Sequence, residues 1–263
     1  LDIDSTLQST DDKTVYDSHC VAFDNVSLKY HGAGDESLTD ISFFADKGDV
    51  IGIIGSTGSG KSSLVNLIAH YYDATKGKVT VNGRDVKSYD KTELRSNIGF
   101  VMQKAVLFAG TVRDNIKWGK QNATDDEINE ALKIAQVYDT VYDKDGLDTV
   151  VEQGGANFSG GQKQRLSIAR AVVSKPDIIV LDDSASALDF ATEKALREAI
   201  LSLDYKPTLF IVSQRCSSIL SADKIIVLDD GKCIASGTNE QLLKSCEVYR
   251  EIYSSQFTIK EAE

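Results

Sequence analysis

The sequence predicts an α/β fold with a parallel sheet at its core. Three short apolar segments, DIIVLDD, TLFIVSQ and KIIVLDDGK, are typical of buried strands, and helix-like segments such as LDFATEKALREAILSL separate them. Strands that alternate with helices favour parallel pairing. A glycine-rich segment, GSTGSGKS, lies between a further apolar strand and a helical pattern.

The composition is that of a globular chain with excess negative charge. Its 263 residues are 41% hydrophobic and 26% charged, with a formal net charge of -11. Apolar stretches such as IGIIG and KIIVL are much shorter than the roughly 18 residues of a membrane span. Because this net charge repels phosphate backbones, we expect no nucleic-acid partner, and a local set of donors must hold any phosphate.

The two ends of the sequence are expected to lie outside the folded domain. Residues 1–19 are polar and lack a sustained period, which predicts a linker, while residues 20–255 form the domain and 256–263 a tail. Nothing near Leu1 resembles a signal sequence, so we expect this linker to continue from a longer polypeptide. The cysteines are widely spaced and are expected to be reduced packing residues rather than metal ligands: Cys20, Cys216, Cys233 and Cys246.

The order of local patterns divides the domain into subdomains. VAFDNVSLKY alternates as a strand, SLTDISFFADKGDVIGIIG indicates strand, turn and strand, and KGKVTVNGRDV predicts a hairpin that turns at Asn-Gly. These segments predict an antiparallel β subdomain. Residues from about 104 to 172 are mainly helical in pattern and predict a helical subdomain. One helical face follows GSTGSGKS, at Leu64, Leu67, Ile68 and Tyr71.

The segment from Gly55 to Ser62 fits the pattern GxxxxGK[ST] and predicts a P-loop. Its glycines let backbone N–H groups turn toward a polyphosphate at a helix N-terminus, while Lys61 reaches the terminal phosphates and Ser62 reaches magnesium. A glycine-rich turn that merely enters a helix is the alternative. The predicted nucleotide-binding residues of this loop are Gly55, Ser56, Thr57, Gly58, Ser59, Gly60, Lys61, Ser62 and Ser63.

A second carboxylate element is expected on another strand. Four apolar residues precede Asp182, which we predict to be the magnesium-side carboxylate. The stretch KIIVLDD at 224–230 has the same pattern, so the pattern alone does not choose between them. The preceding segment FSGGQKQR, at 158–165, selects Asp182.

The P-loop, FSGGQ and IIVLDD in this order resemble the nucleotide-binding domain of ATP-binding-cassette (ABC) transporters, over about residues 20–255. The resemblance implies an ABC ATPase fold with a helical signature subdomain, and ATP and magnesium as cofactors. It implies that Tyr30 stacks on adenine, for which an edge-strand tyrosine is the alternative. It also places Gln103 of FVMQ at the Q-loop, and Ser186 to Asp189 at the D-loop. The implied magnesium-side residues are Ser62, Gln103 and Asp182.

The SGGQ segment is expected to begin a helix that offers its N-terminal donors to a phosphate. In the resembled family that phosphate belongs to ATP on a second nucleotide-binding domain, so one chain holds two half-sites. The signature residues that would close over the partner's ATP are Ser159, Gly160, Gly161 and Gln162. The phrase LFAGTVRDNI is similar to the exporter branch, in which a membrane domain precedes this module on the same polypeptide. A position at the cytoplasmic face of the cell membrane follows from that resemblance.

Two chemical positions depart from the family pattern. Asp183 stands where efficient members carry Glu, and Gln214 stands where they carry His. The shorter side chain withdraws the carboxylate by roughly 1.5 Å, and a misplacement near 1 Å can cost on the order of a hundredfold in rate. An amide cannot carry the charge of an imidazolium. Neutral drift is the alternative at either position. Smaller departures are Phe158 for Leu and Gln153 for Glu.

These departures predict the degenerate half of a heterodimeric, multidrug-type exporter, with a hydrolysis-impaired site of its own and an SGGQ that completes the partner's site. A homodimeric, fully active ABC ATPase and a nucleotide-gated clamp without transport are the alternatives. DNA-repair relatives separate the P-loop from the second carboxylate by a long coiled coil, whereas Lys61 and Asp182 are 121 positions apart (182 minus 61). A GTPase would need an NKxD element to bind guanine, and this sequence has none.

Overall fold

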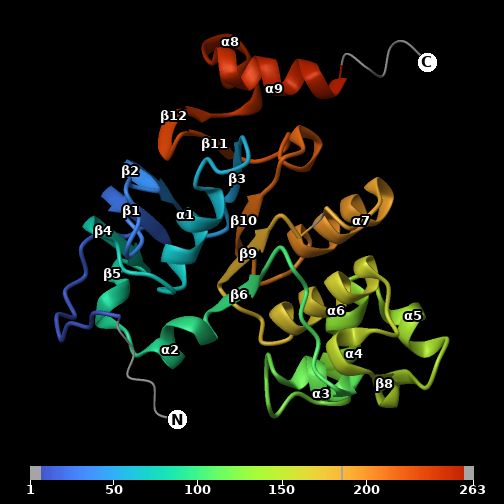
Figure 1. Cartoon of the computed structure of the whole chain (residues 1–263). Coiled ribbons are helices and arrows are strands. Elements are labelled where there is room, and N and C mark those ends of the chain that lie inside the picture. The colour runs from blue at the N-terminus through green and yellow to red at the C-terminus, as the bar shows by residue number, and fades with distance from the viewer. Residues whose placement is uncertain (1–6, 185, 258–263) are drawn as a thin grey trace. The chain divides into compact units, whose positions relative to one another are not determined.

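The computed structural model describes residues 7–184 and 186–257 and divides the chain into two compact units (Figure 1). The first unit contains the described residues up to 95 and those from 214 onward, and the second contains residues 96–213. Residues 1–6 of the expected linker and 258–263 of the expected tail lie outside the described residues.

An antiparallel sheet opens the first unit, in the strand order β2-β1-β4-β5. This confirms the predicted antiparallel β region. The β4–β5 hairpin turns at Asn82 and Gly83, whose φ angles are 48° and 73°. Two positive φ angles in a two-residue loop match the twist of the flanking strands, so the predicted Asn-Gly turn is confirmed. The strands are β1 (Val21–Leu28), β2 (Leu38–Ala45), β4 (Lys76–Val81) and β5 (Arg84–Asp85).

Three further strands of the first unit carry its parallel pairing. β3 (Val50–Gly55) pairs in parallel with β11 (Lys224–Asp229), and β11 pairs antiparallel with β12 (Lys232–Gly237). Every residue of β3 is buried, as its continuous apolar run predicts. β12 lacks such a run and was not predicted.

Helix α1 (Lys61–Ile68) follows β3 and buries Leu64, Leu67 and Ile68. The predicted helical face extended to Tyr71, which is one turn too far, because His70 adopts a left-handed backbone with φ 48°. The remaining elements of this unit are the 3₁₀ turns η1 (Val86–Ser88) and η4 (Cys216–Ser218) and the helices α8 (Asn239–Ser245) and α9 (Glu247–Phe257); α2 (Lys91–Ser96) ends at the first residue of the second unit.

The second unit contains three parallel strands, β6 (Ile98–Val101), β9 (Ile178–Asp182) and β10 (Thr208–Val212). β9 pairs with β6 on one side and with β10 on the other. Every residue of β9 and β10 is buried, and helix α7 (Phe190–Leu201) connects these two strands. The predicted alternation of strands and helices with parallel pairing is confirmed.

Helices dominate the rest of the second unit between residues 112 and 172. Side chains cap α3, α4 and α6 at their N-termini, through the capping boxes of Thr111, Thr124 and Ser159, in which two backbone donors are satisfied reciprocally. The elements are β7 (Gly110–Thr111), α3 (Val112–Lys117), α4 (Asp125–Ile134), α5 (Tyr138–Tyr142), η2 (Gly146–Asp148), β8 (Val150–Val151), η3 (Gln153–Gly155) and α6 (Gly160–Val172).

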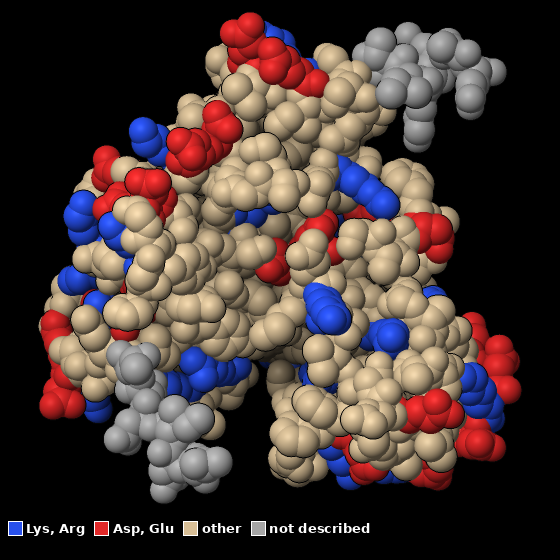
Figure 2. Space-filling view, viewed as in Figure 1, with Lys and Arg blue, Asp and Glu red and all other residues tan. Residues whose placement is uncertain are grey.

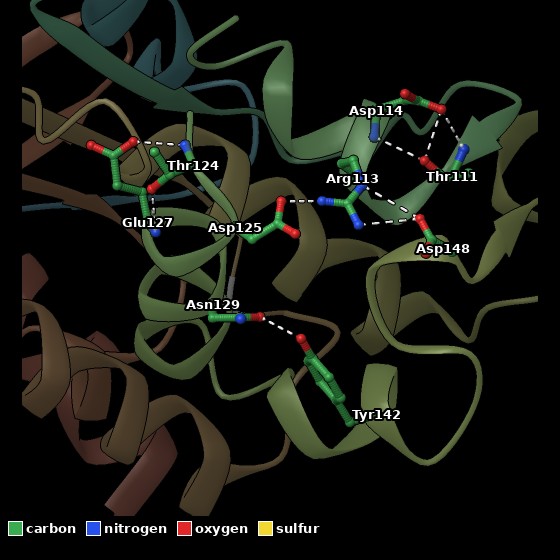
Figure 3. A network of polar contacts seen from close by, with 9 residues as sticks. All are labelled: Thr111, Arg113, Asp114, Thr124, Asp125, Glu127, Asn129, Tyr142 and Asp148. Carbon is green, nitrogen blue, oxygen red and sulfur yellow. Dashed lines mark hydrogen bonds and ion pairs between the residues drawn. The ribbon is translucent and has the colours of Figure 1, made fainter. Parts of the chain in front are cut away.

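Arg113 joins three of these elements (Figure 3). Its guanidinium, on α3, pairs with Asp125 at the start of α4 and donates to Asp148 of η2 at 3.2 Å. The carboxylates are more than half exposed, so each pair contributes at most about 1 kcal/mol. Arg113 therefore links α3, α4 and η2 through exposed ion pairs that add little to the stability of the fold.

The described part of the N-terminal segment lies along the edge of β5. Val15 forms an isolated antiparallel bridge with Arg84, and the Tyr16 amide donates to Gly83 O at 2.8 Å. The Lys78 ammonium stands 3.1 Å from the centre of the Tyr16 ring. Earlier in the segment, the Gln8 amide donates to Asp73 Oδ2 at 2.8 Å and the Thr10 amide donates to Lys87 O at 2.9 Å. The described part of the predicted linker is thus hydrogen-bonded to the rest of the first unit.

Among residues 7–184 and 186–257, no helix combines the length and the apolar character needed to cross a bilayer.

Candidate functional site

The glycine-rich loop turns tightly between β3 and α1. Gly58 and Gly60 have φ angles of 83° and 96°, in the left-handed region that glycine adopts without steric cost. A Cβ on Gly60 would stand 2.7 Å from Ser37 O and 2.8 Å from a methyl group of Leu38. Gly60 is also the N-cap of α1 and supplies no side-chain cap. The helix therefore begins with backbone amides at a positively polarised terminus.

The Lys61 side chain folds back over this loop. Its ammonium donates to Gly55 O at 2.9 Å and to Ser56 O at 2.6 Å. Lys61 is only 8% exposed, and a buried ammonium requires such partners. The loop thus holds a fixed positive charge beside the N-terminus of α1. This arrangement suits a polyphosphate, which would bring oxygens of higher charge than the carbonyls.

Tyr30 is tied to the first turns of α1. Its hydroxyl donates to Ser63 Oγ at 2.9 Å, and its ring meets Tyr72 edge to face, with 4.8 Å between centroids. The structure therefore brings together two predicted binding residues, Tyr30 and Ser63. Tyr72 supports the Tyr30 ring and was missed, because an exposed tyrosine beyond the helical face gave no signal in the sequence.

The second unit gathers Asp182, Asp183 and Gln103. Asp182 ends β9 and is 6% exposed. Asp183 follows in a left-handed conformation, with φ 46°, and its amide donates to Val212 O at 3.0 Å. The Gln103 side-chain amide donates to Asp183 Oδ2 at 2.9 Å. Two predicted site residues, Gln103 and Asp183, are therefore in direct contact.

The signature helix supports the segment that carries Gln103. Gln164 of α6 is 2% exposed, and its side-chain amide donates to Met102 O at 3.1 Å. A neutral amide buried in a helix usually has such a partner. Gln164 was missed by the sequence reasoning, although a glutamine among the buried positions of an amphipathic helix is the available signal.

Ser186 and Asp189 lie between Asp183 and the first turn of α7. Both the amide and the hydroxyl of Ser186 bond to Asp183 O, at 3.3 and 2.9 Å. Asp189 caps α7 and accepts from the Thr192 amide at 2.9 Å and from its hydroxyl at 2.8 Å. These hydrogen bonds lower the pKa of the Asp189 carboxyl below its ordinary value. Asp189 is therefore an ionised helix cap.

The signature residues form the N-terminus of α6. The Gln162 amide donates to Ser159 Oγ at 3.2 Å, and the Ser159 amide donates to Gln162 Oε1 at 2.9 Å. A Cβ on Gly161 would stand 3.0 Å from Ala187 O, whereas one on Gly160 would meet no atom within 4 Å. The chain's own packing thus explains Gly161 but leaves Gly160 open. Phe158 packs inward at 4% exposure, with the Lys144 ammonium 4.2 Å from its ring centre.

Gln214 is exposed and belongs to the first unit. Its backbone carbonyl accepts from the Gln256 side-chain amide at 2.8 Å. The predicted site residues consequently divide between the units: Tyr30, Gly55 to Ser63 and Gln214 lie in the first, and Gln103, Ser159 to Gln162, Asp182, Asp183 and Asp189 lie in the second.

The metal-binding chemistry of these residues favours a hard cation. Over the described residues, no group of three or more His, Cys, Asp and Glu side chains could hold a metal ion by itself. Of the predicted magnesium-side residues, Ser62 in the first unit has a hydroxyl, and Gln103 and Asp182 in the second have an amide and a carboxylate. Magnesium commonly binds through one or two carboxylates together with substrate phosphates, so the chemistry of these side chains suits it. The four cysteines are free.

A glycine-rich loop whose buried lysine lies at the start of a helix, in an α/β protein, defines a P-loop NTPase. The family model described as ABC transporter matches residues 38–186, which is more than half of the chain. The protein therefore belongs to the ABC transporter family and has the fold of its ATPase domain. The excess negative charge does not contradict a phosphate site, because acidic side chains are dispersed over both units (Figure 2) and the candidate donors are local.

Relatives that are known by sequence agree with this family. The chain is 44% identical over 238 residues to YfiB of Bacillus subtilis, an uncharacterised ABC transporter ATP-binding protein, covering 90% of this chain and 41% of that protein. It is 40% identical over 237 residues to a Staphylococcus aureus protein provisionally named a multidrug export ATP-binding/permease protein, with coverage of 90% and 41%. The chain thus spans about two fifths of the length of these relatives.

A solved structure also matches. A bacterial Atm1-family ABC exporter with ATP bound has a TM-score of 0.89 and 33% sequence identity, and the match covers 97% of this chain and 46% of that chain. The similarity supports an exporter-type ABC nucleotide-binding domain.

Proposed function

We propose that this chain is the motor domain of an ABC exporter, which binds MgATP and couples its binding and hydrolysis to substrate export. The observation that carries the proposal is Lys61, whose buried ammonium spans the glycine-rich loop at the uncapped start of α1. That feature concentrates positive charge and amide donors at one point of an acidic protein. The named exporters among the relatives support the direction of transport.

We propose roles in nucleotide binding for residues of each unit. The loop from Gly55 to Ser63 would bind the phosphates, and Tyr30, braced by Tyr72, would stack on adenine. Ser62, Gln103 and Asp182 would hold magnesium, directly or through water. When bound, the magnesium ion neutralises charge on the phosphates.

The signature segment is proposed to serve a second nucleotide-binding domain. Gly160 is exposed, and a Cβ there would meet no atom of residues 7–184 and 186–257 within 4 Å, so their packing does not require glycine. Close approach of another molecule's phosphate would require it. The name of one relative joins an ATP-binding part to a permease part. We therefore propose a membrane domain upstream on the same polypeptide, a head-to-tail partner domain, and a place at the cytoplasmic face of the cell membrane.

The chain's own half-site is proposed to hydrolyse ATP weakly. The Asp183 carboxylate is shorter than the Glu of efficient members, and one of its oxygens already accepts a hydrogen bond from Gln103. Both features would place the carboxylate poorly for holding the attacking water. In addition, Gln214 is an uncharged amide and cannot supply the positive charge of an imidazolium. A heterodimer, in which the partner supplies the competent site, follows from this asymmetry.

Nucleotide binding by the full chain tests the proposal. The Lys61→Ala variant should bind ATP at least tenfold more weakly, because charge-assisted hydrogen bonds contribute about 1.5–3 kcal/mol. Lys232→Ala, which removes an exposed lysine from β12, is the matched control and should bind as the parent does. Equal ATP affinity in the Lys61→Ala variant and the parent, measured by titration calorimetry, would reject the proposed site.

A second measurement separates the assembly hypotheses. In the assembled transporter, Ser159→Arg should abolish most ATP turnover, because the signature of this chain completes the partner's site. Undiminished turnover would reject a role in trans. Substantial turnover by this chain without a different partner would instead indicate a homodimeric, fully active ATPase.

A further inference from the structure

The C-terminal helix holds the backbone at Gln214 through one side chain. The Gln256 amide group donates to Gln214 O at 2.8 Å, and its oxygen accepts from the Cys216 amide, also at 2.8 Å. Both polar ends of Gln256 are therefore used on one short stretch of main chain. The three residues belong to the first unit, and residues 214 to 216 lie outside its strands, with Cys216 beginning η4.

Helix α9 is itself anchored to its own unit. Tyr249 is fully buried, and its hydroxyl donates to Asn239 Oδ1 at 2.8 Å at the start of α8. Figure 1 shows α8 and α9 running one after the other beside β12. Burial of one tyrosine provides roughly 1.5–3 kcal/mol of transfer free energy. Gln256 lies two turns further along α9, so the position of its amide is set by a packed helix.

Gln256 fixes the backbone of a residue whose own side chain is exposed. We call its two hydrogen bonds, to Gln214 O and from the Cys216 amide, the Gln256 clamp. Gln214 is exposed, while Cys216 is fully buried and begins η4. The backbone of an exposed loop is ordinarily mobile. Here, however, the carbonyl of Gln214 and the amide two residues later are both fixed. The direction in which the Gln214 side chain leaves the backbone is consequently fixed as well.

We propose that Gln256 is a positioning residue for the nucleotide site: through the backbone of Gln214, α9 sets how the Gln214 side chain meets the terminal phosphate of bound ATP. The inference rests on the function proposed above, which assigns Gln214 to that phosphate. It makes the C-terminal helix a regulator of the site. Displacement of α9 by another part of the assembly would lower the affinity for ATP without changing the P-loop.

The preference for ATP over ADP in the full chain tests the inference. Gln256→Glu keeps the size and the acceptor for the Cys216 amide but replaces the donor to Gln214 O with a carboxylate. Loss of one hydrogen bond should lower ATP affinity roughly fivefold. ADP affinity should stay unchanged, because ADP lacks the terminal phosphate. Ser255→Glu adds the same charge one residue away, at an exposed position of α9, and should change neither affinity.

A double-mutant cycle shows whether Gln256 acts through Gln214. In a Gln214→Ala background, Gln256→Glu should have no further effect on the ratio of ATP to ADP affinity. An effect of equal size in both backgrounds, or no effect in the parent, would overturn the inference. Equal loss of ATP and ADP affinity would also overturn it, since that result means general damage to the domain.

Failure of the proposed function gives a different result. If this chain does not bind nucleotide through its P-loop, the parent and Lys61→Ala variants bind ATP equally and the ratio cannot depend on Gln256. If the parent binds ATP through Lys61 while Gln256→Glu leaves the ratio unchanged, only the positioning role is rejected.

Discussion

The side-chain amide of Gln103 donates a 2.9 Å hydrogen bond to the carboxylate of Asp183. The two residues are separated by 80 positions in the sequence. The family resemblance predicts Gln103 to be the Q-loop residue and Asp183 to stand where efficient members carry Glu. The left-handed backbone at Asp183 favours a short polar side chain, because Asp and Asn tolerate this conformation better than most residues. The departure from Glu thus agrees with its local structure.

Restoring the family's residues should increase catalysis. We expect Asp183→Glu together with Gln214→His to raise ATP turnover at this chain's own site by tenfold or more, since the longer carboxylate reaches the water position. The measurement is phosphate release by the assembled transporter. Unchanged turnover would contradict the degenerate-site interpretation.

Asp230→Glu provides the matched control for that experiment. Asp230 also follows an apolar strand that ends in Asp, and its φ of 42° is close to the 46° of Asp183. The two Glu variants should therefore lose similar stability, about 1 kcal/mol at most. Only the change at 183 should raise turnover.

The Gln103–Asp183 hydrogen bond should contribute measurably to stability. A cycle of Gln103→Ala, Asp183→Ala and the double variant should give a coupling energy of about 0.5–1.5 kcal/mol, measured by urea unfolding. Glu152→Ala is a control for loss of an exposed carboxylate in the same unit. Additive effects of the two changes would show that the contact contributes nothing in solution.

Ser159 has a structural and a proposed functional role that two substitutions separate. Ser159→Ala should lower the free energy of unfolding by about 1 kcal/mol, because it removes the N-cap of α6. Ser159→Asp keeps a capping oxygen and should retain stability, yet it places a negative charge where the partner's phosphate is expected, so turnover of the assembled transporter should fall sharply.

Thr124→Asp is the control for the Ser159 substitutions. Thr124 forms the same capping box at the start of α4, so the change should leave both stability and turnover close to the parent. Retained turnover in Ser159→Asp would contradict the proposed contact with a phosphate.

The Cys216 thiol should react slowly. Burial raises its pKa to about 11, so only about 1% is thiolate at pH 9 in the folded chain, against roughly half in the unfolded chain. Since the folded thiol keeps its proton longer, its contribution to stability is complete below about pH 9 and is lost as the pH rises toward 11. Iodoacetamide labelling followed by mass spectrometry checks this; equal rates in buffer and in urea would contradict it.

Local patterns predicted most of the fold. β1, β9 and β10 combine continuous or alternating apolar residues with turn signals at their ends, and such patterns depend only on neighbouring residues. β12 escaped prediction because KCIASG alternates exposed and half-buried positions and has no apolar run. It is specified by its pairing with β11, which the sequence pattern does not reveal.

The candidate site was predictable where its residues are contiguous. The loop from Gly55 to Ser63 is one such segment, and Ser159 to Gln162 is another. The contact between Gln103 and Asp183 was not foreseen, because it depends on how β6 and β9 pair in parallel. The clamp by Gln256 was missed for the same reason, as it joins the end of the chain to a backbone some 40 residues earlier.

The N-terminal segment has a consequence for solubility. β5 is the outermost strand of the antiparallel sheet, and an unpaired strand edge is a template for intermolecular pairing. The bridge between Val15 and Arg84, together with the bond from the Tyr16 amide to Gly83 O, occupies that edge. A version of the domain trimmed to begin at Cys20 would therefore leave the edge of β5 unpaired. It should self-associate more readily than the longer chain.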